Sequence, residues 1–230
     1  MSINSLPDVH IFQDPDSSTC GPSCLAMVYA MKGKKITREE ILRDFRHGEK
    51  GEFSYTPQLA RHLLANGLPN RLHIAGSNFG LLPSWRGLTK EEVIDNLKVW
   101  LTLHAQDESH LDSLHILFYL QEGGEIAIEA YTADTLKSLL GNGSVLIVCI
   151  DEAWIWQHRR RLDNKRVMDD LVGGSEGHFV VITGYTSDML HVLDPFPTNI
   201  PGRHGAYDIE ANEIVNASLT WDPQIIEILA

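Results

Sequence analysis

Two apolar runs near the C-terminal end, residues 178–185 and 189–193, constrain the fold of this chain more than any other feature of its sequence. Only three residues, 186–188, separate the runs, and this spacing is typical of a β-hairpin. In an antiparallel pair, the start of the first strand lies beside the end of the second. The hairpin therefore brings His178, which opens the first strand, close to Asp194, which closes the second.

A second motif, Cys20-Gly21-Pro22, lies near the N-terminal end. Proline has no backbone N–H to donate and its φ angle suits a first helical turn, so we expect a helix to begin at Cys20 or Gly21. The partial positive charge at that end of a helix favours a thiolate. A cysteine at this position, facing a histidine that a carboxylate orients, provides the nucleophile, base and orienting group of covalent acyl transfer.

Together these segments resemble the bacteriocin-processing cysteine peptidases and their stand-alone relatives, within the papain-like superfamily. The residues that carry the resemblance are Gln13, Cys20-Gly21-Pro22, Leu25-Ala26-Met27, Gly177-His178 and Leu193-Asp194-Pro195. The resemblance implies an α+β papain-like fold over residues 1–230, with the nucleophile helix packed on an antiparallel sheet. It also implies a cysteine peptidase that cleaves a peptide, isopeptide or γ-glutamyl-type amide bond without a cofactor.

In that interpretation the thiolate of Cys20 attacks the carbonyl carbon, His178 transfers the proton and Asp194 holds the imidazole. Gln13 and the backbone N–H of Cys20 would stabilise the oxyanion. Each residue also has a simpler explanation. Cys20 could be a packing residue, Asp194 a turn residue before a proline, and Gln13 a partner for loop backbone.

Two other functions stay open. The same segments are similar to phytochelatin synthase, a papain-like γ-glutamylcysteine dipeptidyltransferase, which would pass the acyl group to an amine and not to water. A chain of this kind could also be a peptide-recognition module without catalysis, although it has both Cys20 and His178.

The segment between the two motifs is long, since 158 residues separate Cys20 from His178. This is more than the transporter-attached peptidases have, so we expect a helical insertion at about residues 77–124. Helical patterns at residues 89–104 and 111–121 support it, and earlier helices are expected at residues 20–31, from 38 and from 56. Strands are expected mainly in the second half, at residues 72–75, 126–131, 145–150 and 224–229, with helices at 133–140 and near 210–219.

A long connection, residues 151–177, directly precedes His178, and within it residues 157–168 form a basic segment with five positive side chains and one negative. Long loops of this kind often recognise substrates. The candidate substrate-binding residues in it are Trp154, Trp156, Arg159, Arg160 and Arg161. If they face the cleft, their charge would attract an acidic peptide segment. In the alternative, the segment is a surface helix whose arginines pair with neighbouring aspartates.

Composition limits the remaining possibilities. The formal charge of −12 argues against unaided binding to nucleic acid or to an anionic membrane. Residues 1–8 lack the pattern of a secretory signal, and three cysteines without a Cys-x-x-Cys pair do not suggest a disulfide framework. We therefore expect a reduced, cytoplasmic protein. The eleven histidines show no metal-ligand spacing, so no metal site is expected, and nothing in the sequence indicates an oligomeric state.

Overall fold

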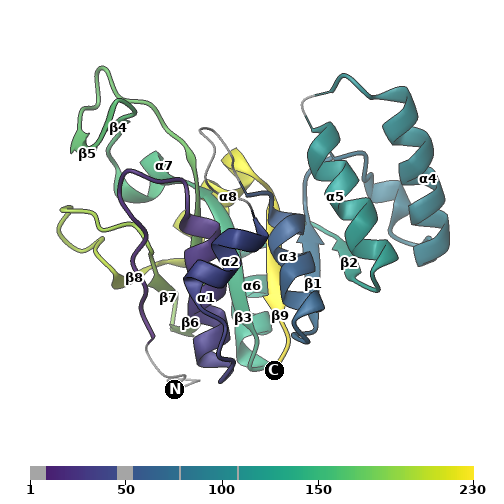
Figure 1. The fold of residues 1–230 in the computed structure, drawn as a ribbon, viewed down its shortest axis with the longest axis horizontal. Helices are drawn as coiled ribbons and strands as arrows, with labels where there is room; N and C mark the ends of the chain where they lie inside the picture. Colours follow the sequence, from purple (N-terminus) through teal and green to yellow (C-terminus); the bar gives the residue numbers. More distant parts are fainter. Residues whose placement is uncertain (1–8, 46–53, 78, 108) are drawn as a thin grey trace.

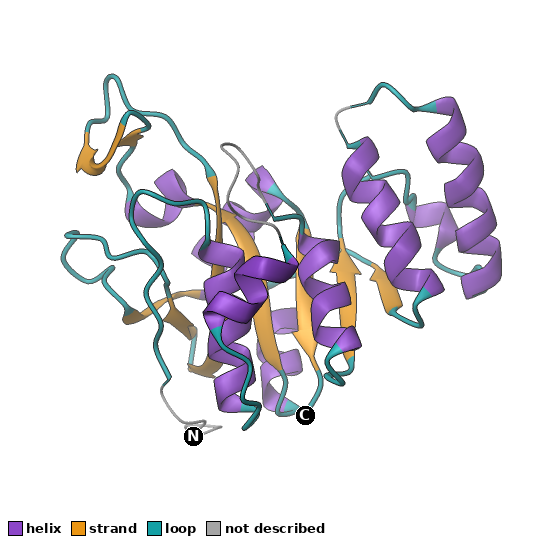
Figure 2. Cartoon of the chain, in the orientation of Figure 1, coloured by secondary structure: helices purple, strands orange, loops and turns teal. Residues whose placement is uncertain are grey.

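A computed structural model describes residues 9–45, 54–77, 79–107 and 109–230. Over these ranges the chain forms a seven-stranded sheet with helices on both faces, and a separate two-stranded hairpin (Figures 1 and 2). The part of the chain described has no helix that is both long and apolar enough to cross a membrane. The sequence-based expectation about a secretory signal concerns residues 1–8, which lie outside the described residues.

Helices and strands follow the predicted order closely. The helices are α1 (Cys20–Met31), α2 (Arg38–Asp44), α3 (Thr56–Ala65), the short 3-10 helix η1 (Pro83–Trp85), α4 (Lys90–Leu103), α5 (His110–Gln121), α6 (Ala133–Gly141), α7 (Glu152–Trp156) and α8 (Ala211–Trp221). The strands are β1 (Asn70–Ile74), β2 (Glu125–Ile128), β3 (Val145–Asp151), β4 (Arg160–Arg161), β5 (Asn164–Met168), β6 (Gly177–Thr186), β7 (Met189–Leu193), β8 (Ala206–Glu210) and β9 (Gln224–Ile228).

The large sheet has the strand order β2-β1-β9-β3-β6-β7-β8. Every neighbouring pair is antiparallel except β1 and β2, which are parallel at one edge. Parallel neighbours need a long crossover connection, and here η1, α4 and α5 supply it. Figure 1 shows α4 and α5 at the β2 edge of the sheet. The segment that we expected to be an insertion, about residues 77–124, therefore lies in the connection between β1 and β2.

The sheet is buried on both faces, and β3 shows why its sequence is continuously apolar. Val145, Ile147 and Cys149 pack into the core that contains α1, α3 and α5. The alternate residues of the strand pack into a second core beneath α6 and α8. Because successive side chains of a strand point to opposite faces, a strand covered on both sides needs apolar residues at every position.

Helix α1 is the central helix of the first core and packs against β6. Ten of its twelve residues are buried, so it lacks the polar face of a surface helix. It begins at Cys20, as the Gly-Pro motif predicts, and Cys20 is one of its two partly exposed residues. The burial of the rest of the helix fixes the position of that first turn.

Two parts of the chain differ from the expectation. Strand β8 was not predicted, although Tyr207 and Ile209 alternate with exposed residues as in a half-buried strand. The connection 151–177 is neither a bare loop nor a surface helix. It forms the short helix α7 and then the hairpin of β4 and β5.

Candidate active site

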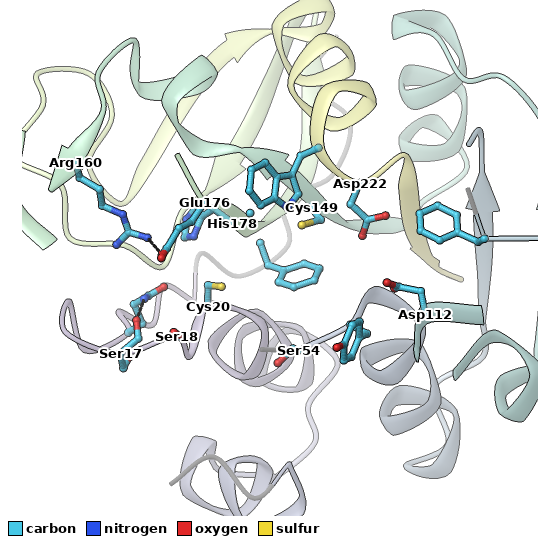
Figure 3. A pocket seen from close by; sticks show the side chains of 16 residues that line it. Ser17, Ser18, Cys20, Ser54, Asp112, Cys149, Arg160, Glu176, His178 and Asp222 are labelled. Atoms are coloured by element: carbon cyan, nitrogen blue, oxygen red, sulfur yellow. Dashed lines mark hydrogen bonds and ion pairs between the residues drawn. The ribbon is translucent and has the colours of Figure 1, made fainter. Parts of the chain in front are cut away.

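The predicted hairpin is confirmed, because β6 and β7 are antiparallel neighbours. His178 is the second residue of β6, and Asp194 directly follows β7. The Nε2 atom of His178 lies 2.7 Å from Oδ1 of Asp194. Both side chains are buried, with exposed fractions of 2% and 0%. Because α1 packs on β6, the first residue of α1, Cys20, lies near His178, and both line the same pocket (Figure 3).

Asp194 accepts hydrogen bonds at both carboxylate oxygens. Besides the contact with His178, Oδ1 accepts from the backbone N–H of Phe196 at 2.9 Å. Oδ2 accepts from the indole N–H of Trp156 at 3.1 Å and from the hydroxyl of Tyr207 at 2.9 Å. Four contacts of this kind hold a buried carboxylate in one orientation, and they satisfy the charge that burial would otherwise destabilise.

The surroundings of Cys20 favour a thiolate. Burial raises the pKa of its thiol, but hydrogen bonding to His178 and the charge of the imidazolium lower it, and the backbone N–H groups of Phe179 and Gly21 act in the same direction. The net pKa is below the ordinary value. Cys24 and Cys149 are buried, and burial raises the pKa of both thiols well above that value. The three free cysteines therefore differ sharply in reactivity.

The pKa values of His178 and Asp194 are shifted in opposite directions. Burial lowers the pKa of the imidazole, but the charge and hydrogen bond of Asp194 outweigh it, so this pKa lies well above its usual range. Burial raises the pKa of the Asp194 carboxyl, while the charge of His178 lowers it more, and the net shift is downward. With Nε2 engaged by Asp194, the other ring nitrogen, Nδ1, is the one available to Cys20. This arrangement supports a thiolate–imidazolium pair.

Gln13 lies beside this group and lines the same pocket. Its backbone N–H donates to the carbonyl of Pro195 at 2.8 Å, which ties the loop before α1 to the segment after Asp194. One side-chain N–H donates to the carbonyl of Ser17 at 3.1 Å, and the side-chain oxygen is buried without a partner. The amide thus supports its own loop, as the simpler explanation expected, and still has a second N–H.

The pocket that contains Cys20 and His178 has a volume of about 400 Å³. Several of its residues were not predicted from the sequence. They are Tyr55, Phe79, Asp112, Trp221 and Asp222. Asp112 comes from α5 and Asp222 follows α8, so only the packing of distant elements brings them to this pocket. No local motif marks either residue.

Comparison with known protein families identifies the family of this chain. Residues 7–222 match the sequence model of the Peptidase C39 like family. The chain belongs to this family. The family is one of cysteine peptidases, so the resemblance inferred from the motifs is confirmed. A search of curated protein sequences finds no significant match.

Two solved structures are similar to this chain, and the first shares its fold. One is described as a C39-like peptidase from Bacillus anthracis; it has 12% sequence identity and a TM-score of 0.50, over 100% of this chain and 98% of that one. Another is the peptidase domain of Streptococcus ComA, a bifunctional ABC transporter involved in a quorum-sensing pathway. It has 13% identity and a TM-score of 0.44, over 97% of this chain and 99% of that one.

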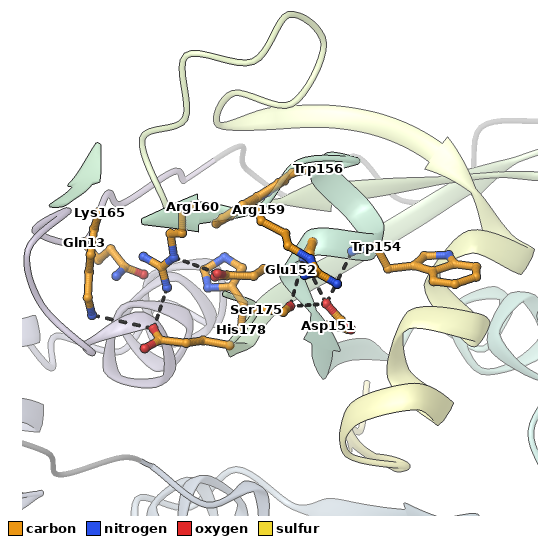
Figure 4. Close-up of polar contacts among 12 residues, drawn as sticks. Gln13, Asp151, Glu152, Trp154, Trp156, Arg159, Arg160, Lys165, Ser175 and His178 are labelled. Atoms are coloured by element: carbon orange, nitrogen blue, oxygen red, sulfur yellow. Dashed lines mark hydrogen bonds and ion pairs between the residues drawn. The ribbon is translucent and has the colours of Figure 1, made fainter. Parts of the chain in front are cut away.

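The C39-like chain places the five candidate substrate-binding residues in different surroundings. Trp156 is buried beneath Asp194, so it holds the carboxylate and does not line the pocket. Trp154 is 49% exposed and points away from His178 (Figure 4). Arg159 is exposed, and Arg161 pairs with Asp163 at the surface. Of the five, only Arg160 lines the pocket.

Arg160 is itself neutralised by carboxylates. It is 4% exposed, and it donates to Glu152 at 2.7 Å and to Glu176 at 2.8 Å. Its guanidinium also lies over the ring of Phe196, 4.8 Å from the centroid. The positive charge of this segment is largely paired within the fold, because Arg161, Lys165 and Arg166 also form ion pairs with carboxylates. Binding of an acidic substrate by this segment stays a prediction. The hairpin turns Arg160 inward, which charge counting along the sequence could not reveal.

Proposed function

We propose that this C39-like protein hydrolyses amide bonds in peptides, with Cys20 as nucleophile, His178 as proton-transfer group and Asp194 as orienting group. The observation that carries the proposal is the arrangement of these three side chains. A thiol of lowered pKa at a helix N-terminus contacts a buried imidazole, whose far nitrogen lies 2.7 Å from a buried carboxylate. Such an arrangement activates a nucleophile at neutral pH.

The reaction begins when the Cys20 thiolate adds to the carbonyl carbon and the carbonyl oxygen becomes negatively charged. In the proposal, the backbone N–H of Cys20 and the second side-chain N–H of Gln13 donate to this oxyanion. Backbone N–H groups of a first helical turn have no acceptor within the helix, so the first donor is available. The helix terminus adds a favourable partial charge.

Collapse of the adduct breaks the C–N bond, and the His178 imidazolium gives its Nδ1 proton to the departing amine. This leaves a thioester on Cys20 and a neutral imidazole. His178 then removes a proton from water as the water attacks the thioester, and the acid product leaves with the thiolate restored. Asp194 keeps the ring oriented through both steps, and the four donors around it keep the carboxylate ionised.

The proposal is tested by incubating the purified protein with a defined mixture of peptides and identifying new termini by mass spectrometry. We expect cleavage that is lost in Cys20→Ser and His178→Ala. Cys24→Ser is the matched control, because Cys24 lies one turn further along α1 and a serine hydroxyl can also donate to Phe179. Products joined to an added amine, without hydrolysis, would instead indicate a transferase. Equal cleavage by Cys20→Ser would overturn the cysteine mechanism.

A further inference from the structure

Two carboxyl groups, those of Asp112 and Asp222, line the same pocket as Cys20. We call them the carboxyl pair. Both residues are half-buried, and in Figure 3 they lie on the opposite side of Cys20 from Arg160. Asp112 is on α5 and Asp222 is the residue after α8. The part of the pocket beyond the nucleophile is therefore acidic, although the basic segment, residues 157–168, lies close before His178 in sequence.

Within the described ranges, the carboxyl pair has neutral partners but no cation. Asp222 accepts from the hydroxyl of Thr56 at 2.6 Å and from the side-chain N–H of Gln224 at 2.8 Å. The side chain of Gln224 is fully buried and also forms a hydrogen bond with Asp112. Its side-chain oxygen has no partner. Among the residues that the structure describes, no lysine, arginine or histidine forms an ion pair with either carboxyl group. The side-chain amide of Gln224 thus adjoins both carboxyl groups, and its oxygen can still accept a hydrogen bond.

The electrostatics of the carboxyl pair by itself are unfavourable. Burial raises the pKa of Asp112 to about 7, and the charge of Asp222 adds to the shift. Burial raises the pKa of Asp222 to about 6, against the hydrogen bonds of Thr56 and Gln224. Close carboxylates in a weakly hydrated site repel each other, and an opposite charge between them removes the penalty. A bound cation would let both groups ionise at neutral pH.

The residues that line the pocket indicate which type of cation fits it. Tyr55, Phe79 and Trp221 line the pocket together with the carboxyl pair. Aromatic walls that end in carboxylates suit a side chain with an aliphatic stem and a charged tip, as in lysine or arginine. Across the described ranges, no group of three or more His, Cys, Asp or Glu side chains is placed to hold a metal ion. An organic cation therefore fits the site better than a metal.

We propose that the carboxyl pair and Gln224 form a specificity subsite for a lysine or arginine side chain of the peptide substrate. The inference rests on the proposed peptidase function, since the substrate must reach Cys20. The ammonium or guanidinium N–H groups donate to the carboxyl pair and to the unpartnered oxygen of Gln224. The aliphatic stem lies along the aromatic wall. The substrate preference is thus cationic, opposite to the one that the basic segment suggested.

The test compares two affinity reagents that differ only in the terminal charge, N-blocked lysyl and norleucyl chloromethyl ketones. Each alkylates an active-site cysteine, so the rate of modification of Cys20 reports binding without requiring turnover. Hydrogen bonds to charged groups are stronger than neutral ones, so we expect the lysyl reagent to react about tenfold faster at pH 7.5. The ratio should fall below pH 6 as the carboxyl pair becomes protonated.

Variants then assign the preference to these residues. Asp112→Asn should clearly reduce the lysyl-to-norleucyl ratio, because it removes one of the two charges and keeps the shape of the side chain. Asp95→Asn is the control, since Asp95 pairs with Lys98 on the exposed face of α4 and should keep the wild-type ratio. Thermal unfolding of both variants checks the fold. The ratio of the two reagents on the wild-type protein is measured without any variant, so a variant that fails to fold cannot hide a missing preference.

The outcomes separate the two proposals. A ratio of about one in the wild-type protein, with Cys20 modified by both reagents, overturns the subsite and leaves the peptidase proposal intact. An unchanged ratio in Asp112→Asn also overturns the subsite. Failure of both reagents and of iodoacetamide to modify Cys20 overturns the peptidase proposal, and the subsite with it.

Discussion

Asp194→Asn is the substitution that probes the site most specifically, because it removes one charge and changes the volume little. Asn can keep an oxygen at the Oδ1 position, where it accepts from His178 and Phe196. Its NH₂ group then lies at the Oδ2 position, opposite two donors. The hydroxyl of Tyr207 can rotate to accept, but the indole N–H of Trp156 cannot. One buried donor is left without a partner.

The two consequences have different sizes. The unpaired indole N–H costs about 1–3 kcal/mol of folding free energy. The charge lost beside His178 was worth about 4 kcal/mol for groups about 4 Å apart at an effective dielectric constant of about 20. At about 1.4 kcal/mol per pKa unit, the pKa of His178 falls by up to about 3 units. The imidazolium is then lost at lower pH, so the active range should shrink from its alkaline side.

The assay is the pH dependence of kcat/KM for a cleaved peptide, together with thermal unfolding. In the wild-type protein we expect a bell-shaped profile, with the acid limb set by the pair's thiol and the alkaline limb by its imidazolium. In Asp194→Asn the alkaline limb should move down by about 1 to 3 pH units. An alkaline limb at the same pH in both proteins, with activity retained, would refute the role given to Asp194.

Three further predictions concern neighbouring groups. Trp156→Phe keeps an aromatic ring but removes a donor to Asp194, so kcat should fall about tenfold while KM stays close to the wild-type value. A change in KM alone would indicate that Trp156 binds the substrate. Arg160→Met leaves the buried carboxylate of Glu152 without its cation and removes one of two ion-pair partners of Glu176, so it should destabilise the fold by about 3–5 kcal/mol. Arg161→Gln at the surface should cost under about 1 kcal/mol; denaturant unfolding measures both, and equal effects would contradict the pairing. The raised pKa of His178 stabilises the fold fully below the unfolded-state pKa of about 6.5, and the lowered pKa of Asp194 stabilises it fully above the unfolded-state pKa of about 3.9. The contribution of the pair to stability should therefore be greatest between about pH 4 and 6.5 and decline outside this range. A melting temperature that depends on pH in the same way in Asp194→Asn would argue against this contribution.

Much of the site could be predicted because its signals are local. The helix start at Cys20 follows from a proline in the first turn, and the proximity of His178 and Asp194 follows from a short turn between two strands. The same hairpin predicts that the carboxylate of Asp194 is the partner that orients the imidazole of His178. The helix of residues 38–44 likewise begins at a capping box that the sequence shows.

The rest depends on contacts between distant elements. Tyr207 reaches Asp194 from β8, a short strand that runs directly into α8. Asp112 and Asp222 meet only because α5, in the crossover between parallel strands, packs near the end of α8. The pairing of Arg160 depends on a hairpin that turns the side chain inward. Sequence spacing carries no information on any of these distances.

The most direct test of the account is the rate at which iodoacetamide alkylates Cys20 as a function of pH, followed by mass mapping of the modified residue. If Cys20 and His178 form a thiolate–imidazolium pair, the midpoint lies below the value of about 8.5 for a free thiol and rises in His178→Ala. Cys24 and Cys149 should remain unmodified in the native protein, because both are buried. A midpoint near 8.5 that is the same in His178→Ala would contradict the pair and the mechanism built on it.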